Sequence, residues 1–100
     1  MTVYEHRTSL LIQSGSSATT SLKVKGGLLR QVIIHAMTDS TVFRAHLGDS
    51  HDLCRLEWGF HTGELSENAI AMPMVGAYTL TILNASQVDT VEILLAVQED

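Results

Sequence analysis

Residues 28–37, LLRQVIIHAM, decide the fold class of this chain of 100 residues. Apolar side chains alternate on both faces of the stretch: Val32, Ile34 and Ala36 share one face, and Ile33 and Met37 share the other. A short run that is apolar on both faces is typical of a strand buried on both sides. The stretch therefore predicts a central β-strand.

Similar runs of period two lie on both sides of it, separated by short segments rich in Gly, Ser, Asp and Asn. They predict further strands at residues 3–12, 19–24, 41–47, 53–60, 70–74, 77–83 and 90–98. No segment shows the 3.6-residue period of a helix over a helical length. The pattern predicts an all-β fold, a seven- to eight-stranded antiparallel sandwich that is either a jelly roll or immunoglobulin-like.

Three of these strands carry the most apolar inward stripes and should supply the centre of the core. The residues expected there are Val32, Ile34, Leu80, Ile82, Ile93 and Leu95. The polar residues 61–69 are expected to form the longest connection, with room for one helical turn. Pro73 lacks an amide donor, so its strand is expected at a sheet edge.

The first 25 residues differ from the rest and are expected to form an N-terminal arm or hairpin, with residues 26–100 as the sandwich domain. Residues 3–12 have no consistently apolar face, and the small polar residues 13–18 would let this segment leave the body. Through Tyr4 and Arg7, the arm would pair with a neighbouring subunit or lie across a partner surface. The alternative is a hairpin that closes the chain's own sandwich.

Composition narrows the function classes. The formal net charge of −5 argues against a nucleic-acid binder, because such proteins usually carry a basic surface. No apolar run approaches the ~20 residues of a membrane helix, and the N-terminus lacks the pattern of a signal peptide. The single cysteine, Cys54, cannot form an internal disulfide, which fits a reducing compartment.

Candidate chemistry is sparse, and no catalytic, cofactor or metal site is expected. His46, His51 and Cys54 are the densest set of metal-binding side chains, but they lack the tight spacing of zinc ligands. Residues 48–52, GDSHD, place two carboxylates in one loop, where calcium would need several more oxygen ligands. No Gly-x-Ser-x-Gly elbow is present, and Cys54 is interpreted as a small core residue.

One set of aromatic side chains suggests an alternative function. Trp58, Phe60 and Tyr78 could form a platform on which a sugar ring stacks, as in carbohydrate-binding sandwiches. The other interpretation is that this stripe belongs to the core. Exposure of Trp58 separates the two, because a buried indole removes the platform.

A surplus of apolar residues is more informative. The positions opposite the main inward stripes should be polar in a monomeric sandwich, yet several of them are apolar. These residues are Leu29, Ile33, Met37, Leu83, Leu94 and Ala96. They predict an association surface, unless the register of one or two strands differs and turns them inward.

Several segments together resemble the small β-sandwich proteins of tailed-phage virions, such as capsid decoration (cement) proteins and related head or tail accessory proteins. The segments are residues 27–36, GLLRQVIIHA; Met72-Pro73-Met74; residues 76–82, GAYTLTI; and the final strand over 91–97. The resemblance covers residues 26–98 and carries over no functional residues.

The resemblance implies a structural role on the capsid exterior of a bacteriophage virion assembled in the host cytoplasm. The implied partners are the major capsid protein and further copies of the chain, with a trimer as the expected homo-oligomer. The alternatives are a head–tail or tail accessory protein and a carbohydrate-binding module.

Overall fold

The computed structural model describes residues 2–99, which form seven strands and no helix. The strands are β1 (Thr2–Ile12), β2 (Ala18–Ala36), β3 (Val42–Asp49), β4 (Cys54–Thr62), β5 (Glu64–Glu67), β6 (Met72–Leu83) and β7 (Asp89–Glu99). All pairs are antiparallel. The predicted all-β antiparallel sandwich is therefore confirmed. No helix in this part of the chain could cross a bilayer.

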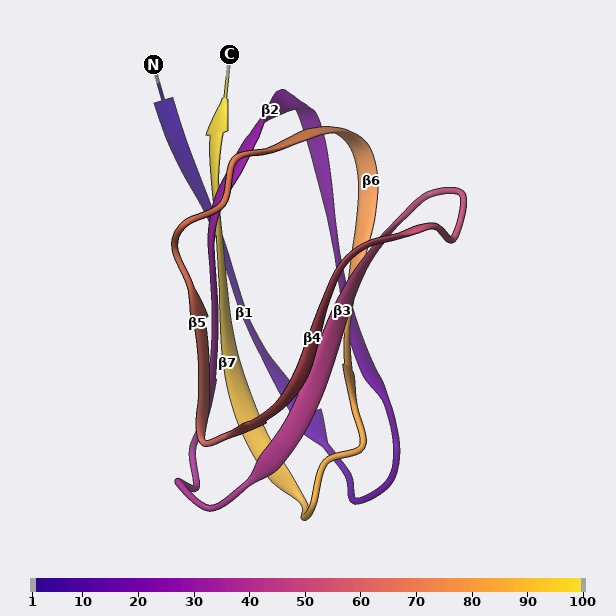
Figure 1. Cartoon of the computed structure of the whole chain (residues 1–100), viewed down its shortest axis with the longest axis vertical. Coiled ribbons are helices and arrows are strands. Elements are labelled where there is room, and N and C mark those ends of the chain that lie inside the picture. The colour runs from indigo at the N-terminus through magenta and orange to yellow at the C-terminus, as the bar shows by residue number, and fades with distance from the viewer. Residues whose placement is uncertain (1, 100) are drawn as a thin grey trace.

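The long strand β2 joins the two layers of the sandwich. Its first half pairs with β6, and its second half pairs with β7 on one side and β5 on the other. One layer is thus β1-β7-β2-β5 and the other is β2-β6-β3-β4. Figure 1 shows β2 rising along one layer, bending at the upper end of the molecule and descending in the other layer.

The bend in β2 coincides with Gly26-Gly27. The register with β6 shifts between Val24 and Gly27, as a β-bulge does. A Cβ atom on Gly27 would lie 2.4 Å from the carbonyl oxygen of Gln98, so only glycine lets β7 approach this closely. The sequence predicted two strands here, at 19–24 and 28–37, because paired glycines usually end a strand. The structure contains one bent strand that runs through the expected boundary at residue 25.

The pairing order distinguishes between the two predicted sandwich types. The first strand pairs with the last, β2 pairs with both β6 and β7, and β3 pairs with β6. Such nested pairing over long sequence distances is the connectivity of a jelly roll. An immunoglobulin-like order would need more hairpins between consecutive strands, whereas β3–β4 is the one such pair among residues 2–99.

The core lies between the layers and contains the predicted residues. Val32, Ile34, Leu80, Ile82, Ile93 and Leu95 are all buried. Phe43 and Leu47 of β3 and Leu65 of β5 complete its centre. Burying a Leu, Ile or Phe side chain contributes about 1.5–3 kcal/mol, so this shared layer supplies the main stabilisation of the fold.

Two expectations about local structure have clear outcomes. Residues 61–69 are not one long connection, because Gly63 turns the chain at a positive φ and Glu64–Glu67 then forms β5 beside β2. Pro73 lies opposite Leu28 of β2, beyond the part of β6 that pairs with β3. The proline itself therefore has a neighbour on one side only, but the separate edge strand predicted at 70–74 does not exist, because Met72–Leu83 is one strand between β2 and β3.

The end of the sandwich drawn lowest in Figure 1 is tied together by the buried carboxylate of Asp89, which is 9% exposed. Its Oδ2 accepts hydrogen bonds from the Thr41 hydroxyl (2.7 Å) and the Thr38 amide (2.9 Å), and its Oδ1 accepts one from the Thr90 amide (2.7 Å). The bond from Thr41, followed by those from the two amides, lowers the pKa of Asp89 despite the opposing effect of desolvation. Asp89 therefore joins the loop after β2 to the start of β7.

Candidate interaction surface

One outer face of the sandwich gathers most of the residues predicted to associate. It belongs to the β1-β7-β2-β5 layer and is called the β7 face. It comprises Val3, Glu5, Arg7, Ser9, Leu11, Gln31, Ile33, His35, Glu64, Ser66, Glu92, Leu94 and Ala96. Side chains alternate along each strand, so these residues point away from the core residues that lie between them.

Strand register brings the apolar members of this face together. Arg7 lies opposite Leu94, Leu94 opposite Ile33, and Ile33 opposite Ser66, which makes one row across four strands. Ile33 and Leu94 are half-buried there and are not part of the buried core cluster. They form the apolar floor of a shallow hollow of about 500 Å³.

Charged and polar side chains surround this floor. Arg7, His35 and Glu92 line the hollow. Arg7 Nη2 lies 3.0 Å from Glu5 Oε1, and His35 Nδ1 lies 3.4 Å from Glu64 Oε1. The exposed Arg7–Glu5 ion pair contributes at most about 1 kcal/mol, so it shapes recognition more than stability.

Large apolar side chains continue the surface beyond the hollow. Val3, Leu11 and Met37 are 59%, 61% and 58% exposed, respectively. Met37 follows β2 directly and is held beside β7 by its amide, which donates to the Thr90 carbonyl at 3.0 Å. An apolar floor with a charged rim and further exposed apolar side chains is the anatomy of a protein–protein contact surface.

The structure unites some of the predicted interface residues and separates others. Ile33, Leu94, Ala96 and Arg7 share the β7 face, although Ala96 is buried between neighbouring strands. Leu83 lies opposite Arg44 on the outer face of the other layer. The sequence-based grouping of Leu83 with Ile33 and Leu94 as one patch is therefore wrong. The association role of the individual residues stays a prediction.

Two further residues of the predicted set behave differently. Leu29 is fully buried, because a bulge between Leu29 and Gln31 shifts the alternation of β2 by one position. Tyr4 points to the opposite side of β1 from Arg7 and is 47% exposed. It lies on the edge strand, opposite the fully buried Val97 of β7.

The predicted metal-binding side chains converge only in part. His46 and Cys54 line a hollow of about 280 Å³ together with Asp49 and Asp52. No group of three or more His, Cys, Asp or Glu side chains among residues 2–99 has the spacing to hold a metal ion. Cys54 is exposed, so its interpretation as a core residue is wrong.

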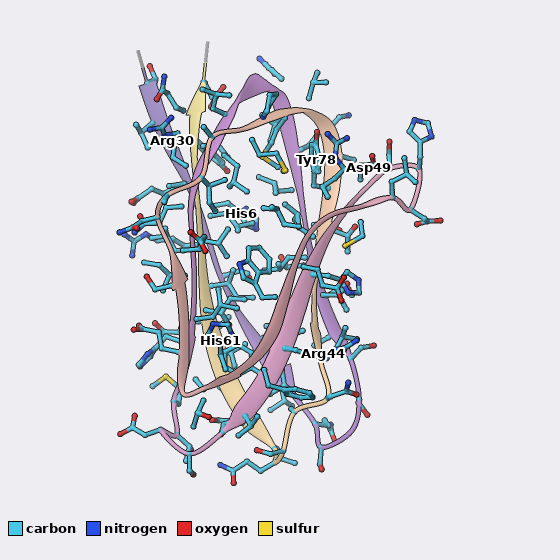
Figure 2. All side chains as sticks on the ribbon, in the orientation of Figure 1. His6, Arg30, Arg44, Asp49, His61 and Tyr78 are labelled. Carbon is cyan, nitrogen blue, oxygen red and sulfur yellow. The ribbon has the colours of Figure 1, made fainter. Side chains whose placement is uncertain are left out.

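The acidic loop after β3 is organised as a turn. Asp49 Oδ1 accepts hydrogen bonds from the amides of His51 (2.8 Å) and Leu53 (3.1 Å), and its Oδ2 lies 3.4 Å from Arg55. The His51 amide is the largest cause of the lowered pKa of Asp49. Asp52 adopts φ 60° within the turn. Figure 2 shows Asp49 at the base of the protruding loop, beside Tyr78, its cross-strand neighbour.

The three aromatic residues do not form a stacking platform. Tyr78 is buried, and its hydroxyl oxygen accepts a hydrogen bond from the Val75 amide at 2.9 Å. Trp58 packs partly buried against the core. A bulge in the β3–β4 pairing turns Phe60 outward, where its ring lies 6.0 Å from the Arg44 guanidinium.

The sequence pattern did not predict several residues of the β7 face. Glu64 and Ser66 belong to a strand of four residues that was expected to be a loop. The sequence signal for this strand is short. Leu65 is apolar and buried between two polar neighbours, so the polar–apolar alternation of a strand occurs only once. Nothing in the sequence places Glu92 and His35 next to Arg7, because this neighbourhood depends on which strands pair.

Comparison with known proteins gives a likeness of fold. No protein-family model matches the chain, and no curated protein matches its sequence. The crystal structure of the Yersinia pseudotuberculosis-derived mitogen YPM superposes with a TM-score of 0.51 at 13% identity, covering 99% of this chain and 88% of that one. This likeness supports the sandwich fold alone.

Two structures of infectious bursal disease virus are also similar. The Gx strain structure gives a TM-score of 0.35 at 11% identity, and the Gt strain structure gives 0.33 at 14% identity. The chain spans about a third of the viral chains, since 32% of each is covered. At these TM-scores, neither match supports a conclusion about function.

Proposed function

We propose that this chain is a non-enzymatic structural subunit that decorates the outside of a bacteriophage capsid and docks on the major capsid protein through the β7 face. The observation that carries the proposal is the apolar floor of Ile33 and Leu94 within a charged rim, on a regular sheet face. A rigid sheet presents such a floor without ordering cost, which favours tight docking on another folded surface. The sequence resemblance to virion proteins selects the shell as that surface.

The two carboxylates with a lowered pKa and the single thiol are hydrogen-bonded to groups of the chain itself. This supports a role without catalysis. The carboxylates of Asp49 and Asp89 each accept two or more hydrogen bonds from the chain's own backbone or hydroxyl groups. The Cys54 thiol lies 3.3 Å from the Leu56 carbonyl oxygen, to which it donates. These groups stabilise turns and loops. A position at the neck or tail of the virion would use the same face on a different partner.

The test is cosedimentation of the purified chain with capsids built from the major capsid protein of the same virus. The wild-type chain should pellet with the capsids. Leu94→Lys places a charge on the apolar floor and should reduce binding by about tenfold or more, since burial of an unpaired charge is costly.

Leu83→Lys is the matched control, because Leu83 is also a half-buried leucine but lies on the outer face of the other layer. It should bind capsids like the wild type. Urea unfolding of both variants checks that the subunits are folded. Absence of capsid binding by the wild type, or equal loss in both variants, would contradict the proposal.

A further inference from the structure

The outer edge of β1 offers a long, regular row of backbone groups. Among residues 2–99, β1 pairs with β7 alone, and its register runs through 11 consecutive residue pairs without a shift. The other free edges are less regular or shorter: the β3–β4 register shifts twice, and β5 has four residues. Unpaired amide and carbonyl groups on such an edge are a template for another strand.

β1 also lacks the devices that usually block such pairing. It contains no proline, no lysine and no bulge. Its exposed charges, Glu5 and Arg7, have opposite signs and lie two residues apart on the same face. Two antiparallel copies of this strand can therefore be complementary to each other.

Charge selects one register for such a pair. Residues that lie opposite each other must share a face, so the residue numbers of each pair sum to an even value. In the register in which paired residue numbers sum to 10, Glu5 lies opposite Glu5 of the second copy. In the register with a sum of 14, Arg7 lies opposite Arg7 of the second copy. A sum of 12 places Glu5 opposite Arg7 twice, once on each side of a two-fold axis through His6.

The same register accounts for the exposure of Tyr4. In the isolated chain this ring is 47% exposed at the end of β1. At a sum of 12 it lies opposite Thr8 of the second copy, where the neighbouring strand would cover it. Glu5 and Arg7 are 46% and 69% exposed and pair with each other at 3.0 Å within one chain, so the dimer exchanges two exposed pairs within the chains for two pairs between the copies.

We infer that two copies of this chain associate edge to edge through antiparallel β1 strands centred on His6. The two β1-β7-β2-β5 layers then form one continuous sheet of eight strands, with both β7 faces on the same side. This two-fold pair departs from the trimer expected from the sequence. It does not rest on capsid attachment, because it needs only a second copy of the chain.

The test exchanges the two charges and measures association by sedimentation equilibrium up to millimolar concentration. The wild type should form a dimer. Arg7→Glu and Glu5→Arg each replace two attractive cross-strand pairs by like charges, and each should weaken the dimer by about tenfold or more. The double variant Glu5→Arg/Arg7→Glu should restore it, as should an equimolar mixture of the two single variants.

Crosslinking reads the register directly, in a Cys54→Ser background that removes the native thiol. Under mild oxidation, His6→Cys should give a covalent dimer because residue 6 faces its own copy at the axis. Thr8→Cys, the matched control, faces residue 4 and should crosslink less. Urea unfolding of every variant establishes that the subunit is folded.

Several outcomes would overturn the inference. These are a monomeric or trimeric mass for the wild type at millimolar concentration, failure of both the double variant and the mixture to restore association, and crosslinking through Thr8→Cys equal to that through His6→Cys. Each of them leaves capsid binding by the monomer unaffected. The inference and the proposed function can therefore fail separately.

Discussion

The two ends of the sandwich are held together in different ways. At the lower end in Figure 1, side chains join segments far apart in sequence: Asp89 binds Thr38 and Thr41, and Ser86 Oγ accepts the Val42 amide at 2.9 Å. At the upper end, the layers are joined by the continuous backbone of β2, bent at Gly27. Asp49, in the loop after β3, binds only residues close to it in sequence: His51, Leu53 and Arg55.

The contrast teaches that similar carboxylate chemistry can have global or local consequences. Asp49 and Asp89 both accept amide hydrogen bonds, and both have a lowered pKa. Asp89 closes a contact across 48 residues to Thr41, whereas Asp49 reaches no farther than six residues, to Arg55. Loss of the first should loosen the whole domain, and loss of the second should loosen one turn.

The largest effect is expected for Asp89→Ala. The change leaves the Thr38 amide and the Thr41 hydroxyl without their acceptor at a buried site, and bonds to charged groups contribute about 1.5–3 kcal/mol each. The free energy of unfolding, measured in urea, should fall by about 3 kcal/mol or more. A loss no greater than that of Asp49→Ala would remove the distinction between the two ends.

Gly27→Ala tests whether the upper end is equally constrained by its backbone. The new Cβ would collide with the Gln98 carbonyl oxygen, so β7 or β2 must shift, at a cost of about 1–3 kcal/mol. Gly59→Ala is the matched control, because nothing lies within 4 Å of its Cβ position. Urea midpoints compare the two. Equal stability of both variants would show that β7 does not pack closely at the bend.

The pH dependence of the unfolding free energy tests the contribution of Asp89 to the lower end. Because folding lowers the pKa of Asp89, its carboxylate stabilises the fold fully above the unfolded-state pKa of about 4. This contribution is lost as the pH falls through the folded pKa below that value. Asp89→Asn should therefore flatten the acid limb of unfolding free energy against pH. An unchanged acid limb would mean that Asp89 is not the group that titrates.

The smallest effect is expected for Asp49→Ala. Its bonds are local to one exposed loop, so the urea midpoint should move less than in Asp89→Ala or Gly27→Ala. The amides of His51 and Leu53 should exchange faster with deuterium. Hydrogen exchange residue by residue measures this. Faster exchange throughout β7 would instead show that the turn supports the whole sandwich.

Strand alternation was sufficient to predict the fold class and the centre of the core. Val32, Ile34, Leu80, Ile82, Ile93 and Leu95 lie where an unbroken period of two places them. Alternation fails at bulges, which add a residue to one strand without any change in composition. The bulge after Leu29 turns that residue inward, and the bulge in β4 turns Phe60 outward.

The sequence was sufficient to predict which residues of the candidate surface point outward, but not which of them lie side by side. Ile33 and Leu94 were expected to point outward, and they do, because their strands keep register around them. Their separation from Leu83 depends on strand order, which one sequence does not contain. The same holds for Asp89, whose partners Thr38 and Thr41 are defined only when β7 lies beside β2.

The antiparallel pairing of β1 with β7 also determines how the molecule would respond to a pull. Thr2 lies opposite Glu99, so both ends of the described chain emerge side by side at the upper end (Figure 1). Tension applied through these two points acts across the ladder and opens its hydrogen bonds one after another, as in unzipping. The bonds never share the load, so β1 should peel away at low force while the remaining strands stay folded.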